Sequence, residues 1–111
     1  MALTDMNKYM RIIVFFDLPV MTKKERHLAT SFRRFLMNDG YYMLQYSVYV
    51  RLCNSVENAE LHFSRLSNEA PKGGSVRCMI VTEKQYANMK IIAGKQKIKE
   101  EPAEYLQMTF L

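Results

Sequence analysis

Residues 10–19 have the sequence MRIIVFFDLP, an apolar run that closes with one carboxylate and a proline. Short runs of β-branched and aromatic residues are typical of a central strand that is buried on both faces. Pro19 cannot continue such a strand, so the chain has to leave the sheet there. Asp17 is therefore expected at the exit edge of the strand, where a carboxylate can meet water, a metal or a partner.

A helix is predicted to follow this strand. Residues 22–25, TKKE, form a capping box in which Thr22 and Glu25 satisfy each other's backbone N–H groups. Gly40 suits the left-handed residue that ends a helix. The apolar face of this helix recurs at helical spacing and comprises Leu28, Phe32, Phe35 and Leu36.

The middle of the chain predicts one extended segment and a second helix. Residues 41–52 are rich in tyrosine and valine, and polar and apolar side chains alternate along 45–52, which indicates a strand. A capping box at Asn54 and Glu57 predicts the helix start, and His62 is expected to face solvent. The expected buried stripe comprises Val56, Ala59, Phe63, Leu66 and Ala70.

The C-terminal part predicts a strand at residues 75–82, a short helix at 83–92 and a polar linker. Residues 105–111 return to strand-like character and are expected to add to a sheet edge, either their own or a partner's. The alternation of strands and helices in 111 residues predicts one α+β domain with both long helices on one sheet face. The other face then needs cover, so an oligomer is expected.

Composition and charge narrow the function classes. The chain is 49% hydrophobic and 24% charged, which is typical of a globular protein and not of a disordered one. The formal net charge of +5 favours anionic partners such as nucleic acid or acidic lipid, although a basic protein without such a partner has the same charge. No apolar run approaches the roughly 18 residues of a membrane helix, so no membrane partner is expected. Cys53 and Cys78 form no CxxC pair, which indicates reduced core residues in a cytoplasmic protein.

Asp17 is the candidate metal-binding and catalytic residue. An aspartate before Leu-Pro is also a common turn former, and that alternative stays open. One carboxylate is a poor cage for most metals, but Mg²⁺ is often held by one or two carboxylates together with water and phosphate. A two-fold dimer would bring two copies of Asp17 together and so supply the second carboxylate.

The first predicted helix is densely basic, with only Glu25 to balance its charge. A solvated basic face is the plain alternative, but this density favours phosphate binding. No Gly-rich phosphate loop and no RNA-recognition motif accompanies it, and the two histidines lack metal-ligand spacing. The candidate nucleic-acid contacts are Lys23, Lys24, Arg26, Arg33 and Arg34 of this helix, together with Arg77 of the later strand.

Five fragments in a fixed order resemble one known family. They are FFDLP at 15–19, KER at 24–26, Gly40, QYSVYV at 45–50 and VTEKQ at 81–85. Together they resemble the second core CRISPR-associated adaptation protein, the Cas-two family, and are most similar to its branch from type II systems. The resemblance covers the chain beyond its first eight residues.

The resemblance implies a ferredoxin-like βαββαβ domain at residues 9–92 in a tight homodimer, after a tail at 1–8. It implies that the extended region at 41–52 is divided near Gln45 into two strands. It also implies that residues 93–111 form a linker and an added C-terminal strand that pairs with the other protomer's sheet.

The resemblance also implies a function and a site. The aspartate that matches Asp17 lies near the two-fold axis and is assigned to a divalent metal, and family members are credited with metal-dependent endonuclease activity on RNA or DNA. Lys24 and Arg26 match basic residues that are candidates for nucleic-acid contact. The family dimer joins two integrase dimers and lies along the captured spacer duplex.

Three hypotheses follow for the function. The first is a non-catalytic scaffold in spacer acquisition that binds double-stranded DNA through its phosphates and bridges CRISPR integrase dimers. The second is a Mg²⁺-dependent endonuclease that uses paired Asp17 carboxylates on RNA or DNA. The third is a small regulatory module that binds a metabolite, for which the sequence offers no pocket.

Overall fold

The computed structural model describes residues 8–94, and in this range four strands and three helices form an α+β fold. The predictions for residues 1–7 and 95–111, including the terminal strand, lie outside this range. Among the described residues, no helix has both the length and the apolar character needed to cross a membrane. In chain order the elements are β1 (Met10–Asp17), α2 (Lys23–Asn38), β2 (Tyr42–Gln45), β3 (Val48–Cys53), α3 (Val56–Glu69), β4 (Ser75–Thr82) and α4 (Glu83–Ala87).

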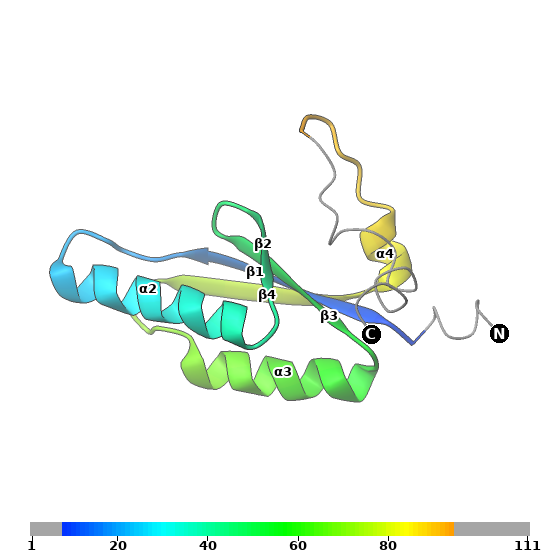
Figure 1. Ribbon diagram of the computed structural model, residues 1–111, viewed down its shortest axis with the longest axis horizontal. Helices are drawn as coiled ribbons and strands as arrows, with labels where there is room; N and C mark the ends of the chain where they lie inside the picture. The colour runs from blue at the N-terminus through cyan, green and yellow to red at the C-terminus, as the bar shows by residue number, and fades with distance from the viewer. Residues whose placement is uncertain (1–7, 95–111) are drawn as a thin grey trace.

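β1 is a central strand of an antiparallel sheet with the order β2–β3–β1–β4 (Figure 1). A strand lies on each side of it, and most of its side chains are buried, as its apolar sequence predicts. The strand order and the two long connecting helices are those of the ferredoxin-like βαββαβ fold, which confirms the predicted fold class. The helix after β4 is shorter than expected and ends at Ala87.

The start and the end of α2 are formed as its sequence predicts. Thr22 Oγ1 accepts a hydrogen bond from the Glu25 N–H at 3.0 Å, and Glu25 Oε1 accepts one from the Thr22 N–H at 2.9 Å. Gly40 has a φ of +94° beyond the helix end. The predicted cap of α3 is one residue too early, because Ser55 and not Asn54 accepts from the Asn58 N–H.

The extended region at 41–52 is divided into β2 and β3 by a tight turn, as the resemblance implied. The interpretation of a single strand from alternating polarity is therefore wrong. Ser47 adopts a left-handed φ of +64°, and its carbonyl accepts a hydrogen bond from the Phe16 N–H at 3.1 Å. The turn contains no glycine, proline or asparagine, and serine is a weaker turn former, so the sequence carries only a weak turn signal there.

Helices α2 and α3 pack on one face of the sheet and form the main core with β1 and β3 (Figure 1). Phe16 lies at the centre of this core. The centre of its ring is 5.3 Å from the ring centre of Phe32 and 5.6 Å from that of Tyr49. The two predicted stripes are confirmed in part. Most of their members lie in the core or pack against it, namely Phe32, Phe35 and Leu36 of the first and Ala59, Leu66 and Ala70 of the second. Leu28 is 43% exposed while Ala29 is buried in α2, and Phe63 is 44% exposed while His62 is buried in α3.

The second sheet face is only partly covered by described residues. At one end, Tyr86 of α4 packs with Ile13 and Val50. At the other end and along the edge strand β4, side chains on this face are exposed, Phe15 by 39% and Met79 by 51%. We call this exposed region the open face and define it by Phe15, Asp17, Arg77 and Met79, which the pairing register places on the same side of two neighbouring strands.

Candidate functional site

Asp17 is the last residue of β1, and its side chain is exposed. Its backbone is paired in register with Ser75 at the start of β4. Leu18 and Pro19 then lead the chain away from the sheet, as the proline predicts. The carboxylate therefore stands at the rim of the open face, where it can be reached from solvent.

Arg77 is the predicted basic residue that lies closest in the sheet to Asp17. It pairs in register with Phe15, two residues before Asp17, so the two charged side chains are diagonal neighbours on the open face. Within residues 8–94, Asp17 forms no ion pair with Arg77 or any other side chain. The open face thus combines an exposed acid, an exposed base and two large apolar side chains.

The fit of this site to a metal depends on its donor set. No group of three or more His, Cys, Asp or Glu side chains in the described part of the chain could hold a metal ion. A closed zinc or calcium site is therefore a poor match for these residues. One exposed carboxylate per chain fits Mg²⁺, which keeps several waters and uses one or two protein carboxylates beside phosphate oxygens.

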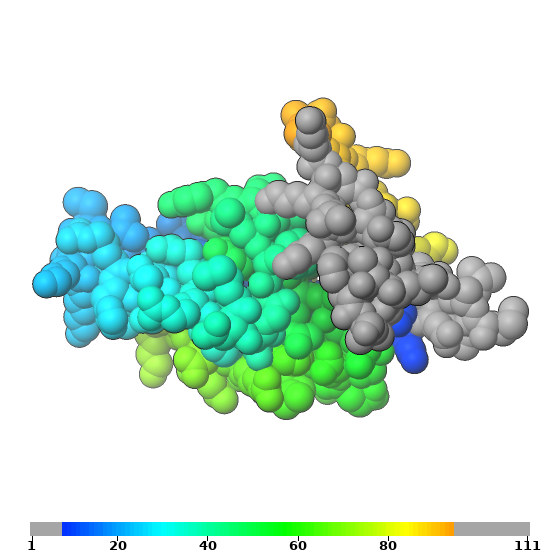
Figure 2. Space-filling view, viewed as in Figure 1, coloured from blue at the N-terminus to red at the C-terminus, as the bar shows by residue number. Residues whose placement is uncertain are grey.

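The basic side chains of α2 are mostly exposed on the side of the helix away from the sheet. Lys23, His27, Thr30 and Arg34 recur at helical spacing and form one stripe, and Lys24 flanks it. The first turns of α2 form a protruding end of the molecule in the view of Figure 2. This surface can therefore be approached by a large anionic partner.

Two of the predicted basic contacts differ from the others. The Arg26 guanidinium donates hydrogen bonds to the carbonyls of Val20 and Met21, at 3.1 and 3.0 Å, and so holds the loop before α2 against the helix. Arg33 is half-buried. Both side chains therefore have less freedom to reach a phosphate than Lys23, Lys24 and Arg34.

A buried polar network that sequence reasoning missed joins β1 to α4. Arg11 donates to both carboxylate oxygens of Glu83, at 2.6 and 3.1 Å, and also to the Tyr42 hydroxyl at 3.1 Å. Its guanidinium lies 4.5 Å from the centre of the Tyr86 ring. Burial opposes the charge of Arg11, but the bonds and the charge of Glu83 outweigh it and raise the pKa of the guanidinium. A lone arginine within the buried run at 10–17 was the signal that a partner was needed.

His62 is a second residue that the sequence misplaced, because it is buried and not solvent-facing. Its Nδ1 lies 2.8 Å from Asp39 Oδ2, and Arg65 donates to Asp39 Oδ1 at 2.9 Å. Asp39 follows α2, whereas His62 and Arg65 belong to α3. These bonds tie the two helices together and lie apart from the open face.

The cysteines are free thiols, as expected, and burial raises the pKa of both Cys53 and Cys78. Both are therefore thiols and not reactive thiolates near neutral pH. Burial also raises the pKa of the Tyr41 hydroxyl, which has no hydrogen-bond partner among the described residues. None of these groups is placed to act on a substrate at the open face.

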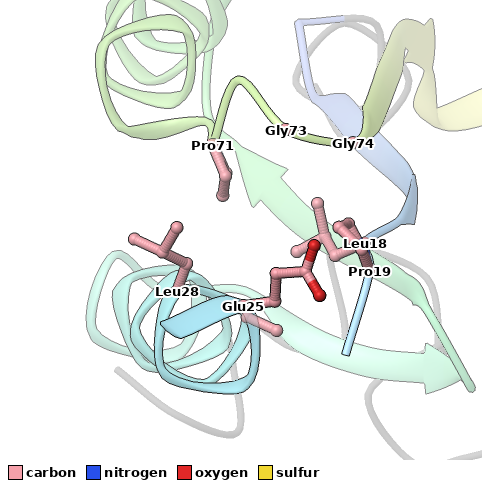
Figure 3. A pocket seen from close by; sticks show the side chains of 8 residues that line it. Leu18, Pro19, Glu25, Leu28, Pro71, Gly73 and Gly74 are labelled. Atoms are coloured by element: carbon pink, nitrogen blue, oxygen red, sulfur yellow. The ribbon is translucent and has the colours of Figure 1, made fainter. Parts of the chain in front are cut away.

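A small apolar cavity lies beside the loop that follows Asp17 (Figure 3). Its volume is about 60 Å³, which is too small for a nucleotide. Residues from the loop, from α2 and from the α3–β4 connection line it, namely Leu18, Pro19, Glu25, Leu28, Ala29, Pro71, Gly73 and Gly74.

Comparison with known proteins gives a consistent result. The model of a family described as CRISPR associated protein Cas2 matches residues 10–89. A protein of Acidovorax ebreus (strain TPSY) is 48% identical over 99 residues, which cover 89% of this chain and 97% of that relative. A protein of Flavobacterium psychrophilum is 42% identical over 108 residues, which cover 95% of this chain and 94% of the relative. Both relatives bear the name CRISPR-associated endoribonuclease Cas2.

Proposed function

Because this chain belongs to the Cas2 family of CRISPR-associated proteins, we propose that it serves spacer acquisition as a homodimeric scaffold. In this role it binds the protospacer duplex through its phosphates and bridges two CRISPR integrase dimers. The observation that supports duplex binding most directly is the exposed basic stripe of α2, which has no acidic partner among the described residues. Lysine and arginine on a helix surface bind phosphates without reading bases.

The open face supports the homodimer. Exposed apolar groups on a sheet face mark a surface that another chain can cover, and Phe15 and Met79 are neighbours there. A second copy related by a two-fold axis would cover the same residues on both chains. A two-fold axis that passes near the rim of this face would bring the two Asp17 carboxylates together.

Charge reversal on α2 tests duplex binding. We expect Lys23→Glu with Lys24→Glu to weaken binding to all duplex sequences alike. The slope of log K against log salt should also become shallower by about 0.9 for each phosphate that the protein no longer neutralises. Arg26 is left intact because its side chain also holds the loop before α2. Fluorescence anisotropy with several unrelated duplexes over a range of salt concentrations measures both effects.

A matched control for this experiment reverses Lys72 and Lys90, two exposed lysines outside α2, with the same change in net charge. This control should retain more duplex affinity than the α2 variant. Equal losses in the two variants would show that net charge alone matters, and unchanged affinity in the α2 variant would remove the helix from the interface.

Introduction of a charged side chain on the open face tests whether the chain dimerises through this face. Phe15→Glu is expected to raise the dimer dissociation constant by about 30-fold or more, since a buried interface anchor contributes about 2 kcal/mol or more. Leu28→Glu is the matched control, because Leu28 is similarly exposed, at 43%, but lies on α2. Sedimentation velocity measures the association. A wild-type chain that stays monomeric, or a Phe15→Glu variant that dimerises normally, would contradict the proposal.

A second candidate function is a Mg²⁺-dependent endonuclease, which coexists with the scaffold. It is favoured by the exposed Asp17 carboxylate beside Arg77 and by the names of the relatives, which describe endoribonucleases. Asp17 of each chain would hold the ion, and a metal bound there supplies activation of water for attack on a phosphodiester. Arg77, a diagonal neighbour of Asp17, would contact a phosphate of the RNA or DNA substrate at the rim that the second copy leaves uncovered.

A further inference from the structure

We infer that Gly74 is a positioning residue for Asp17: the missing side chain at this position lets the start of β4 lie against the backbone of Asp17 and fixes where its carboxylate stands. The inference rests on the proposed metal role of Asp17. It assigns a role to a glycine turn that the sequence alone presents as an ordinary connection.

The geometry leaves no room for a side chain at Gly74. A Cβ atom there would lie 2.6 Å from the Asp17 carbonyl oxygen, 2.8 Å from Leu18 Cδ2 and 3.1 Å from Leu18 Cα. The first and last of these atoms belong to the backbone, so a new methyl group cannot be accommodated by rotation of a side chain. Gly74 does not have a left-handed φ, so alanine fits its backbone conformation. The close contact of the added Cβ atom is therefore the only obstacle to alanine at this position.

Neighbouring Gly73 provides the matched comparison. A Cβ atom at Gly73 would have no atom within 4 Å, and its φ is also outside the left-handed region. Figure 3 shows both glycines in the connection that passes beside Leu18 and Pro19 at the small cavity. A Gly→Ala change at the two positions alters chain flexibility alike, but only the change at Gly74 pushes on Asp17.

The placement of Asp17 depends on this backbone contact because nothing else in the described range holds the carboxylate. Its side chain is exposed and accepts no hydrogen bond from any of these residues. Its position therefore follows from the register with Ser75 and from the approach of Gly74 to the Asp17 carbonyl. A shift of the backbone there would displace the carboxylate from the position of the proposed metal ligand.

The test measures Mn²⁺ binding by electron paramagnetic resonance, and the backbone amide shifts of Asp17 and Leu18 by NMR, in the full-length protein. We expect Gly74→Ala to shift these amides and to raise the Mn²⁺ dissociation constant by about tenfold or more, as for other residues that support a metal ligand. Gly73→Ala should do neither. A folded Gly74→Ala protein with wild-type Mn²⁺ affinity would overturn the inference.

Asp17→Asn separates a failure of this inference from a failure of the proposed metal role. If Asp17→Asn binds Mn²⁺ as the wild type does, the metal role itself is wrong and the inference falls with it. If Asp17→Asn loses Mn²⁺ while Gly74→Ala does not, only the positioning role is wrong.

A second pair of variants covers the case in which Gly74→Ala does not fold. Leu18→Ala removes the side-chain contact at 2.8 Å and leaves the contact with the Asp17 carbonyl. Leu18→Ala with Gly74→Ala should therefore bind Mn²⁺ more weakly than Leu18→Ala alone. Equal affinities in these two proteins would overturn the inference.

Discussion

Replacement of Glu83 by leucine is expected to lower the free energy of unfolding by about 3–5 kcal/mol. Glu83 is 2% exposed and is bonded twice to Arg11, whose side chain is fully buried. The variant removes the two charge-assisted hydrogen bonds that the Glu83 carboxylate accepts from the buried Arg11 guanidinium. Because small domains are stable by only about 5–15 kcal/mol, such a loss is a large part of the total.

The double variant Arg11→Met with Glu83→Leu distinguishes the cost of removing one side of the buried Arg11–Glu83 ion pair from a loss of packing. Buried ion pairs can often be replaced by apolar side chains of similar volume with little loss, so the double variant should be more stable than either single variant. Urea unfolding at one protein concentration, followed by circular dichroism, gives the three free energies. A double variant that loses the sum of both single effects would contradict this account.

Arg65→Met is the control, because it breaks an ion pair that is more exposed than the Arg11–Glu83 pair. Arg65 also bonds a carboxylate, that of Asp39, but its side chain is 52% exposed. Exposed pairs contribute about 0–1 kcal/mol, so this variant should unfold almost as the wild type does. The contrast would show that burial decides the effect of the Glu83 variant.

The sequence predicted those parts of the fold that depend on neighbours along the chain. The apolar run at 10–17, the capping box of Thr22 and Glu25, and the left-handed Gly40 all depend on residues a few positions apart. Each was found where it was expected. The turn between β2 and β3 was missed by pattern alone because Ser47 adopts its left-handed φ without a glycine, under the constraint of pairing with β1.

The features that the sequence did not predict join residues far apart along the chain. Arg11 and Glu83 are separated by 72 positions, and His62 and Asp39 by 23. In α3, the bond to Asp39 makes burial of His62 favourable, and Phe63 is then turned to the surface. Hydrophobic periodicity assigns burial by side-chain type, so it cannot detect a polar partner from another element.

The candidate site was predicted in its parts but not in its arrangement. Asp17 was placed at the exit of β1, and α2 was identified as basic, yet nothing in the sequence related them to Arg77. Pairing of β1 with β4 brings Arg77 to the open face with Asp17, whereas the stripe that includes Lys23 and Arg34 lies on the helix layer that covers the opposite face. The proposed duplex binding by α2 and the proposed cleavage at the open face therefore use two different surfaces.

This separation leads to the second large effect, in which Asp17→Asn should abolish cleavage without abolishing duplex binding. Loss of a group that positions or activates the attacking water typically lowers a rate by about 100-fold or more. The Asp17 side chain is exposed and accepts no hydrogen bond from the residues of the described range, so asparagine should be accommodated without unfolding. Mg²⁺-dependent cleavage of RNA and DNA by the dimer is the activity to measure.

Duplex affinity and spacer integration in cells, measured on the same variant, then separate the two functions. Removal of one negative charge leaves the α2 stripe intact, so duplex affinity should stay the same or rise slightly. Glu60→Gln, an exposed acid on α3, controls for the lost charge and should retain cleavage. Unchanged cleavage in Asp17→Asn would exclude Asp17 from the chemistry. Loss of integration in a dimer that still binds duplex would instead show that spacer acquisition needs the Asp17 carboxylate, because the scaffold surfaces would be unaltered.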